Sequence, residues 1–125
     1  MSKRPDKDIL DEINLDPGGV VVTAKARDGE RLDFVSRYFT PQSSILEDPV
    51  TGSAHCSLAP FWAEKLDRVD LKARQISERG GLIYCQDDPL KDIVIISGSA
   101  ITYMKGHLYV EKTHVVMAKY VRERK

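Results

Sequence analysis

The sequence predicts an α+β fold in which a mostly antiparallel sheet is rolled into a barrel around one central helix. Along its 125 residues, seven segments rich in β-branched and aromatic residues follow one another, and turn signals separate them. A single segment, residues 52–66, instead places its apolar residues at helical spacing. One largely apolar helix among so many strands indicates a sheet wrapped around that helix.

The elements divide the chain into three parts. Residues 1–18 are predicted to form an N-terminal extension with a short helix around residues 9–15. Residues 19–112 are predicted to form one lobe, and residues 113–125 a tail that fits either a helix or a strand and docks on a partner lobe. The predicted strands of the lobe span residues 19–27, 31–39, 69–77, 81–86, 92–97, 100–105 and 107–112. Gly, Pro, Asp and Ser lie between them, as turns require.

The predicted helix carries apolar or small side chains on several faces, so we expect it to be largely enclosed. Phe61 and Trp62 are expected in the core, and Cys56 is expected to be a buried structural thiol. Pro60 removes one backbone hydrogen bond and is expected to kink the helix.

Composition excludes several classes of function. Nineteen basic and nineteen acidic residues cancel, which gives no footprint for nucleic acid or for an anionic membrane surface. The apolar runs are too short to span a bilayer, and the charged N-terminus lacks the apolar core of a signal peptide. The spacing of Cys56 and Cys85 suits reduced thiols in a cytoplasmic protein. The three histidines are scattered, so we expect no metal site.

The stretch "EDPVTGSAHCSLAPFW", residues 47–62, places a carboxylate and a polar turn at the start of the helix. Free backbone N–H groups and the helix dipole bind anions there, and Gly52 permits close approach. Asp48 then faces the same place as a proton-handling or amine-binding group. The alternative is that Asp48 and Thr51, or Ser53, merely cap the helix.

The same stretch resembles the signature of the phenazine-biosynthesis PhzF-like family, which has the diaminopimelate-epimerase fold. Three further blocks match in the order of the family: "DFVSRYFTP" (33–41), "ARQISERGG" (73–81) and "SGSAITYMKGHLYV" (97–110). Members of that family have two similar lobes with the active site between them, and this chain resembles the C-terminal lobe only. They are isomerases that move a proton within a small carboxylate substrate, without a metal or an organic cofactor.

The resemblance implies Asp48 as the site acid and Gly52 and Ser53 as carboxylate-binding residues, with Thr51 and Gln75 as further substrate-binding candidates. It also implies that a glutamate and a histidine of the other lobe are missing here. We therefore expect an isomerase half-site that is inactive alone, with a small carboxylate metabolite as ligand and a homodimer or a second lobe as partner. A non-catalytic binding module and a truncated gene product remain as alternatives.

Two neighbouring features have competing interpretations. His55 follows the signature directly and is either a site residue or an ordinary helix-face residue. The sequence Arg79-Gly80-Gly81 lacks the pattern of a phosphate-binding loop, and we interpret it as a turn that connects two strands.

Overall fold

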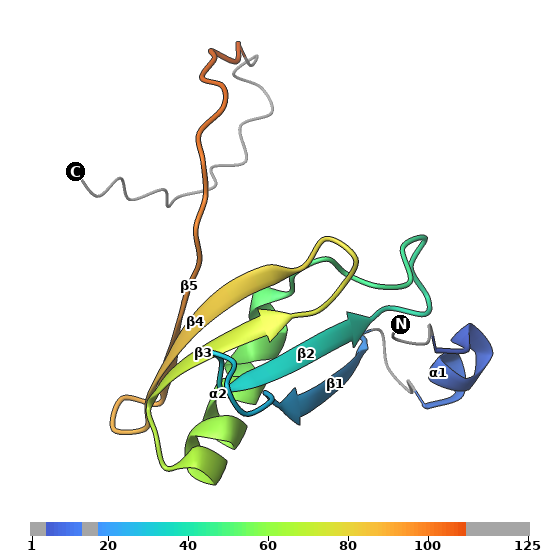
Figure 1. The fold of residues 1–125 in the computed structure, drawn as a ribbon. Coiled ribbons are helices and arrows are strands. Elements are labelled where there is room, and N and C mark those ends of the chain that lie inside the picture. Colours follow the sequence, from blue (N-terminus) through green and yellow to red (C-terminus); the bar gives the residue numbers. More distant parts are fainter. Residues whose placement is uncertain (1–4, 14–17, 110–125) are drawn as a thin grey trace.

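The computed structural model describes residues 5–13 and 18–109. The described helices are α1 (Lys7–Ile13) and α2 (Gly52–Leu66). The described strands are β1 (Val20–Lys25), β2 (Phe34–Phe39), β3 (Asp70–Gln75), β4 (Gly81–Asp88) and β5 (Ile93–Ser97). They form one sheet in the order β1-β2-β3-β4-β5, and α2 crosses one face of it (Figure 1).

The strand pairing confirms an α+β fold with a mostly antiparallel sheet. Three of the four strand pairs are antiparallel, whereas β2 and β3 run parallel. Parallel neighbours need a long crossover connection. The helix α2 lies between β2 and β3 in the chain and supplies that crossover, and it packs on β3, β4 and β5.

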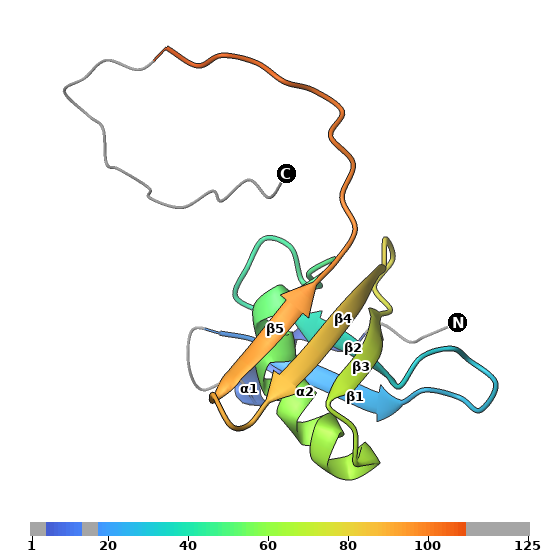
Figure 2. The same cartoon turned by 90° about the vertical axis from the view of Figure 1, so that its left-hand side faces the viewer.

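The sheet is open, so the described residues do not form the predicted barrel. Its edges are β1 and β5. The predicted strand at residues 100–105 is wrong, because residues 98–109 have no regular secondary structure and stand clear of the domain beyond β5 (Figures 1 and 2). The predicted strands at 100–105 and 107–112 would form a two-stranded hairpin, and such a hairpin is marginal in water unless it packs on other parts of a protein. Residues 110–112 of the last predicted strand and the predicted tail, 113–125, lie outside the described residues.

The N-terminal helix begins earlier than the sequence predicts. It spans Lys7–Ile13 instead of residues 9–15, and residues 14–17 are outside the described part of the chain. Asp6 accepts a hydrogen bond from the backbone N–H of Asp8, as a helix cap does, which explains the earlier start. Neither described helix is long and apolar enough to cross a membrane.

The core lies between α2 and the sheet. The buried residues of α2 are spaced as one helix face requires, and they are His55, Leu58, Ala59, Trp62 and Ala63. The sheet contributes Phe34, Leu71, Ala73, Ile83 and Cys85. Burial raises the pKa of the Cys85 thiol to about 11, so this cysteine remains a neutral packing residue.

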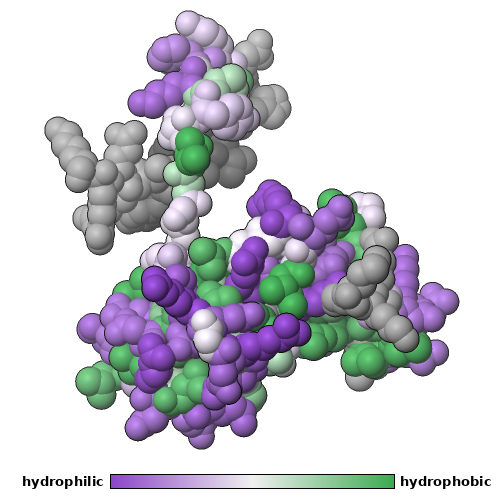
Figure 3. Space-filling model, in the orientation of Figure 1, coloured by the Kyte–Doolittle hydropathy of each residue, from purple (hydrophilic) through white to green (hydrophobic). Residues whose placement is uncertain are grey.

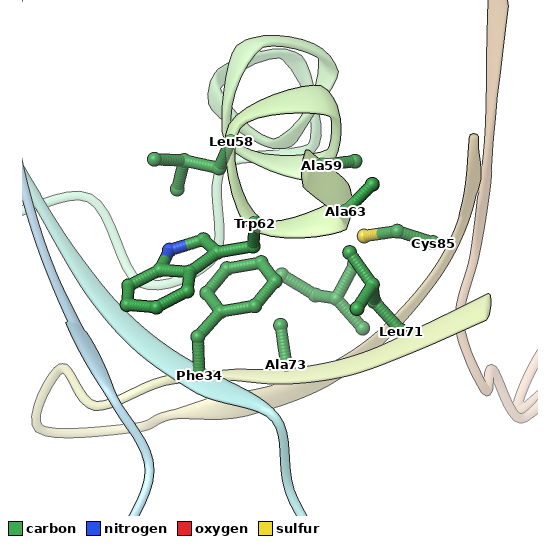
Figure 4. Close-up of a cluster of buried hydrophobic side chains, with 9 residues drawn as sticks. Phe34, Leu58, Ala59, Trp62, Ala63, Leu71, Ala73 and Cys85 are labelled. Carbon is green, nitrogen blue, oxygen red and sulfur yellow. The ribbon is translucent and has the colours of Figure 1, made fainter. Parts of the chain in front are cut away.

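Trp62 joins the helix to β2 and β1. Its ring stacks on Phe34 with 5.6 Å between centroids and 11° between planes (Figure 4). Its indole N–H donates to the Thr23 hydroxyl oxygen at 2.9 Å, so the polar edge of the ring is satisfied. The prediction that Trp62 belongs to the core is confirmed.

The predictions for Phe61 and Cys56 are wrong. Phe61 is 45% exposed and touches Trp62 only edge-on, and Cys56 is exposed. The physical reason is that the sheet covers α2 on one side, whereas the predicted enclosure needs a covering layer on the other side too. The helix continues through Pro60, which is exposed.

Replacing Trp62 with alanine should lower the free energy of unfolding by about 3–5 kcal/mol, because the large ring leaves a cavity against Phe34. The matched Phe61→Ala change, one position along the helix, should cost about 1 kcal/mol because that ring is already half in water. Urea unfolding of both variants measures the difference. Equal losses would contradict the assignment of the core.

Candidate functional site

The loop that leads into α2 is anchored by an ion pair. Arg37 of β2 donates two hydrogen bonds to the Glu47 carboxylate, from Nε at 2.7 Å and from Nη2 at 2.8 Å. Both side chains are largely shielded from water, each being 15% exposed. The hydrogen bond to Glu47 raises the pKa of Arg37 above its ordinary value. The Glu47 carboxylate therefore anchors the loop through Arg37, whereas the carboxylate of the next residue, Asp48, takes no part in this ion pair.

A buried amide fixes the next part of the loop. Gln75, at the end of β3, is fully buried. Its Oε1 accepts the backbone N–H of Thr51 at 2.8 Å, and its Nε2 donates to the backbone carbonyl of Asp48 at 2.7 Å. The same Nε2 lies 3.2 Å from the Thr51 hydroxyl oxygen. Gln75 thus clamps the Asp48–Thr51 turn to the sheet.

Thr51 precedes the helix but does not cap it with its side chain. Its backbone is extended, as an N-cap requires, yet its hydroxyl donates to the Asp48 carboxylate and makes no capping hydrogen bond. The first N–H groups of α2, at Gly52, Ser53 and Ala54, have no intrahelical partner. Within the described part of the chain, the start of the helix therefore offers N–H donors without a partner, directly after a turn whose Asp48 carboxylate is held in place.

His55 holds this turn through a hydrogen bond to the Thr51 backbone. It is fully buried, and its ring stacks against Phe34 at 5.9 Å. Nδ1 donates to the Thr51 carbonyl at 2.7 Å, and Nε2 accepts from the Ser36 hydroxyl at 3.2 Å. Burial lowers the pKa of His55, and the bond to the carbonyl opposes this only in part. The imidazole is therefore neutral near pH 7, with both of its nitrogens occupied.

A cavity of about 520 Å³ opens beside Gly52. Its other walls come from the turn between β3 and β4 and from the end of β5, and its lining residues include Arg79, Gly80, Gly81, Ser97, Gly98 and Ser99. A β-carbon at Gly52 would meet no atom within 4 Å, whereas one at Gly81 would collide with Val50. Gly52 therefore adds no side chain between the cavity and the first backbone N–H groups of α2.

The structure brings most of the residues predicted for the site together. Asp48, Thr51, Gln75 and His55 form one connected hydrogen-bond network. Gly52 lies at the cavity, but Asp48 does not line it. Ser53 is exposed on the first turn of α2, and its side chain makes no hydrogen bond within the described residues.

Sequence reasoning missed two contributions to this region. Arg79-Gly80-Gly81 is the strand connection that was predicted, but it also forms a cavity wall. The consecutive glycines were the available signal, since Gly80 has φ +65°. Ser36 was not singled out, because a lone serine in a strand gives no indication that a histidine 19 residues away will bind it. Among the described residues, no group of three His, Cys, Asp or Glu side chains is placed to hold a metal ion.

Comparisons with known proteins agree with this architecture. The family model of phenazine biosynthesis-like proteins, PhzC-PhzF, matches residues 4–106. An uncharacterized isomerase of Pseudomonas aeruginosa is 47% identical over 90 residues, which cover 72% of this chain and 33% of that protein. A phenazine biosynthesis-like domain-containing protein of Bos taurus is 42% identical over 95 residues, which cover 72% of this chain and 32% of that protein.

Solved structures show the same relationship. A crystal structure of a putative phenazine biosynthesis PhzC/PhzF protein from Clostridium difficile superposes with a TM-score of 0.71 at 40% identity. A PhzF family protein from Enterococcus faecalis gives the same TM-score at 43% identity. Each match covers 86% of this chain and 39% of the solved chain.

The chain spans about a third of the length of the curated relatives it matches. The matched region contains the whole described sheet, helix α2 and the turn that carries Asp48. On the extent of the family match and the identity to several relatives, this chain belongs to the phenazine biosynthesis-like PhzC-PhzF family.

Proposed function

We propose that this chain supplies half of an isomerase site that moves a proton within a small carboxylate substrate without a cofactor. The observation that carries the proposal is the start of α2, where the first N–H groups and the open Gly52 directly follow the turn that holds the Asp48 carboxylate. A helix start of this kind binds anions through its donors and its dipole. The resemblance to PhzF-like isomerases and the name of the bacterial relative support the reaction class.

In this proposal Asp48 is the acid–base group. Thr51 donates to one of its carboxylate oxygens, Oδ2, which orients the carboxylate. A base must lie within hydrogen-bond reach of the proton that it takes. Orientation by Thr51, and the clamp on the backbone of both residues by Gln75, supply that positioning.

The substrate carboxylate is assigned to the first turn of the helix. The N–H groups of Gly52 and Ser53 donate to it, and the exposed Ser53 hydroxyl adds a third donor. Arg79 lines the same cavity as Gly52 and brings a positive charge to its rim. A carboxylate is favoured there over a neutral group.

His55 is a positioning residue in this account. A fully buried ring with both nitrogens bonded cannot reach a substrate without breaking the network around Thr51. Its task is to hold the Thr51 carbonyl and, through it, the turn that carries Asp48.

The other half of the site must come from outside the described residues. Moving a proton between two positions of a substrate needs groups on both of its sides, and water must be excluded. Here Gly52 and Ser53 are exposed. The chain spans about a third of its relatives, so we assign the facing groups to a second lobe and expect no turnover without it. The exposed helix start equally fits a module that binds carboxylates without catalysis.

Small carboxylates, phosphate or sulfate should bind at the start of α2 with millimolar affinity, because one lobe buries little of the ligand. Titration followed by NMR should shift the amide signals of Gly52, Ser53 and Ala54. Asp48→Asn should keep or strengthen this binding, because it removes a repelling charge. Glu64→Gln, in a later turn of α2, is the control with the same change in charge and should leave the affinity unchanged. Amide signals that do not move at these three residues would refute the anion site.

In an enzyme reconstituted with the missing lobe, Asp48→Asn should lower turnover by about 10²–10⁴-fold, the range typical of lost acid–base assistance. A capping role predicts a different pattern: about 1 kcal/mol of lost stability, with turnover unchanged. The rate and the free energy of unfolding, measured on the same variant, separate the two roles.

The stability of the chain should fall as the pH drops below about 6.5, the ordinary pKa of histidine. The unfolded state binds a proton on His55 there, while the folded state, whose His55 pKa is lowered by burial, does not. His55→Gln should flatten this dependence between pH 7.5 and 5.5, measured by urea unfolding. His107→Gln, at an exposed histidine, is the control and should not. Parallel pH profiles for His55→Gln and the unchanged chain would contradict a buried neutral imidazole.

A further inference from the structure

The segment after β5, residues 98–109, carries large apolar side chains that are almost fully exposed. We call this segment the arm. The exposed fractions are 90% for Ile101, 91% for Tyr103, 73% for Met104, 87% for Leu108 and 95% for Tyr109. Figure 3 shows the arm standing clear of the domain. An apolar surface of this kind usually marks a place where something else packs.

The edge strand next to the arm has no protection against further pairing. β5 pairs with β4 on one side, and in the described part of the chain its other side is the edge of the sheet. Natural edge strands carry charges, prolines or bulges that prevent another strand from adding. Residues 93–96 read Ile-Val-Ile-Ile, with no charge and no proline. A run that is apolar on both faces is typical of an interior strand.

The arm and β5 also match in pattern. The first two residues of the arm, 98–99, separate β5 from its apolar part, and Gly-Ser is a sequence suited to a two-residue hairpin loop. Antiparallel pairing in that register places Ile101 beside Ile96 and Tyr103 beside Val94. Val94 and Ile96 pack against the core but are only partly buried. Ile101 and Tyr103 would therefore cover the part of the core that β5 leaves open.

We propose that the arm of one copy of this chain pairs in this register with β5 of a second copy. In the structure the arm continues away from its own β5 and does not fold back on it (Figure 2). In this extended form the arm can pair with β5 of a second molecule. Mutual exchange covers both β5 edges and gives a closed two-fold dimer. Because the formal net charge of the chain is zero, two copies do not repel each other at long range.

The exchange has a consequence for the cavity beside Gly52. Ser97, Gly98 and Ser99, where the arm begins, form one of its walls. Pairing of the arm fixes the backbone of that wall. The inference goes beyond the proposed function and stands on the sheet edge alone, so dimer formation and anion binding are separate measurements.

A pair of introduced cysteines tests the register. In a background of Cys56→Ser and Cys85→Ala, Ile96→Cys combined with Ile101→Cys should form a disulfide-linked dimer under oxidising conditions. The control pair, Ile96→Cys with Thr102→Cys, places the thiols on opposite faces and should not. A link within one chain, found by mass spectrometry, would overturn the exchange, as would the absence of any link.

Sedimentation of the full chain tests the association itself. The unchanged chain should form a dimer, and Ile101→Asp should raise its dissociation constant at least tenfold because the charge faces the core of the partner. Thr102→Asp adds the same charge on the outward face of the arm and should change it much less. A monomer at millimolar concentration, or equal effects of the two variants, would overturn the proposal. Near-UV circular dichroism of Trp62 checks that each variant remains folded.

Discussion

The buried side-chain amide of Gln75 holds the loop on which the candidate site depends. One amide accepts from the Thr51 backbone and donates to the Asp48 backbone, so it fixes both ends of the turn at once. Because Gln75 is fully buried, leaving any of these groups unpaired would carry the full desolvation penalty of a polar group, about 1–3 kcal/mol. The turn therefore has one favoured position, and Asp48 is carried with it.

The crossover topology explains why this clamp lies where it does. β2 and β3 are parallel neighbours, so the chain must return along the sheet through α2 between them. The start of α2 then lies near the end of β3, where Gln75 is, and His55 reaches Ser36 on β2. The same geometry that builds the core between α2 and the sheet leaves the first turn of the helix exposed. The crossover through α2 therefore both builds the core and positions the candidate site.

Much of this could be predicted from the sequence, because it depends on local patterns. The five strands, the helix and the place of Trp62 follow from periodicity and turn residues. The Asp48-to-Ser53 turn was identified from its residue types and from the family resemblance. Phe61 and Cys56 were misplaced because their burial depends on a covering layer that periodicity along one helix cannot reveal.

The remaining features depend on contacts between distant parts of the chain. The bond between Ser36 and His55 spans 19 positions, and the clamp of Gln75 on Thr51 spans 24. The arm has a strand-like sequence, yet a strand forms only by pairing with another strand, and in the structure the arm extends beyond β5 without pairing with its edge. The strand prediction for residues 100–105 was wrong for that reason.

The central claim is that Gln75 pre-organises a carboxylate-binding helix start. The most direct measurement is the dissociation constant of a small carboxylate such as malonate for Gln75→Leu and for the unchanged chain, followed at the Gly52 amide by NMR. The account predicts that leucine, which fills similar space without hydrogen bonds, weakens binding by about tenfold, or about 1.4 kcal/mol, while the Trp62 indole signal stays in its folded position. An unchanged dissociation constant with the fold intact would contradict it.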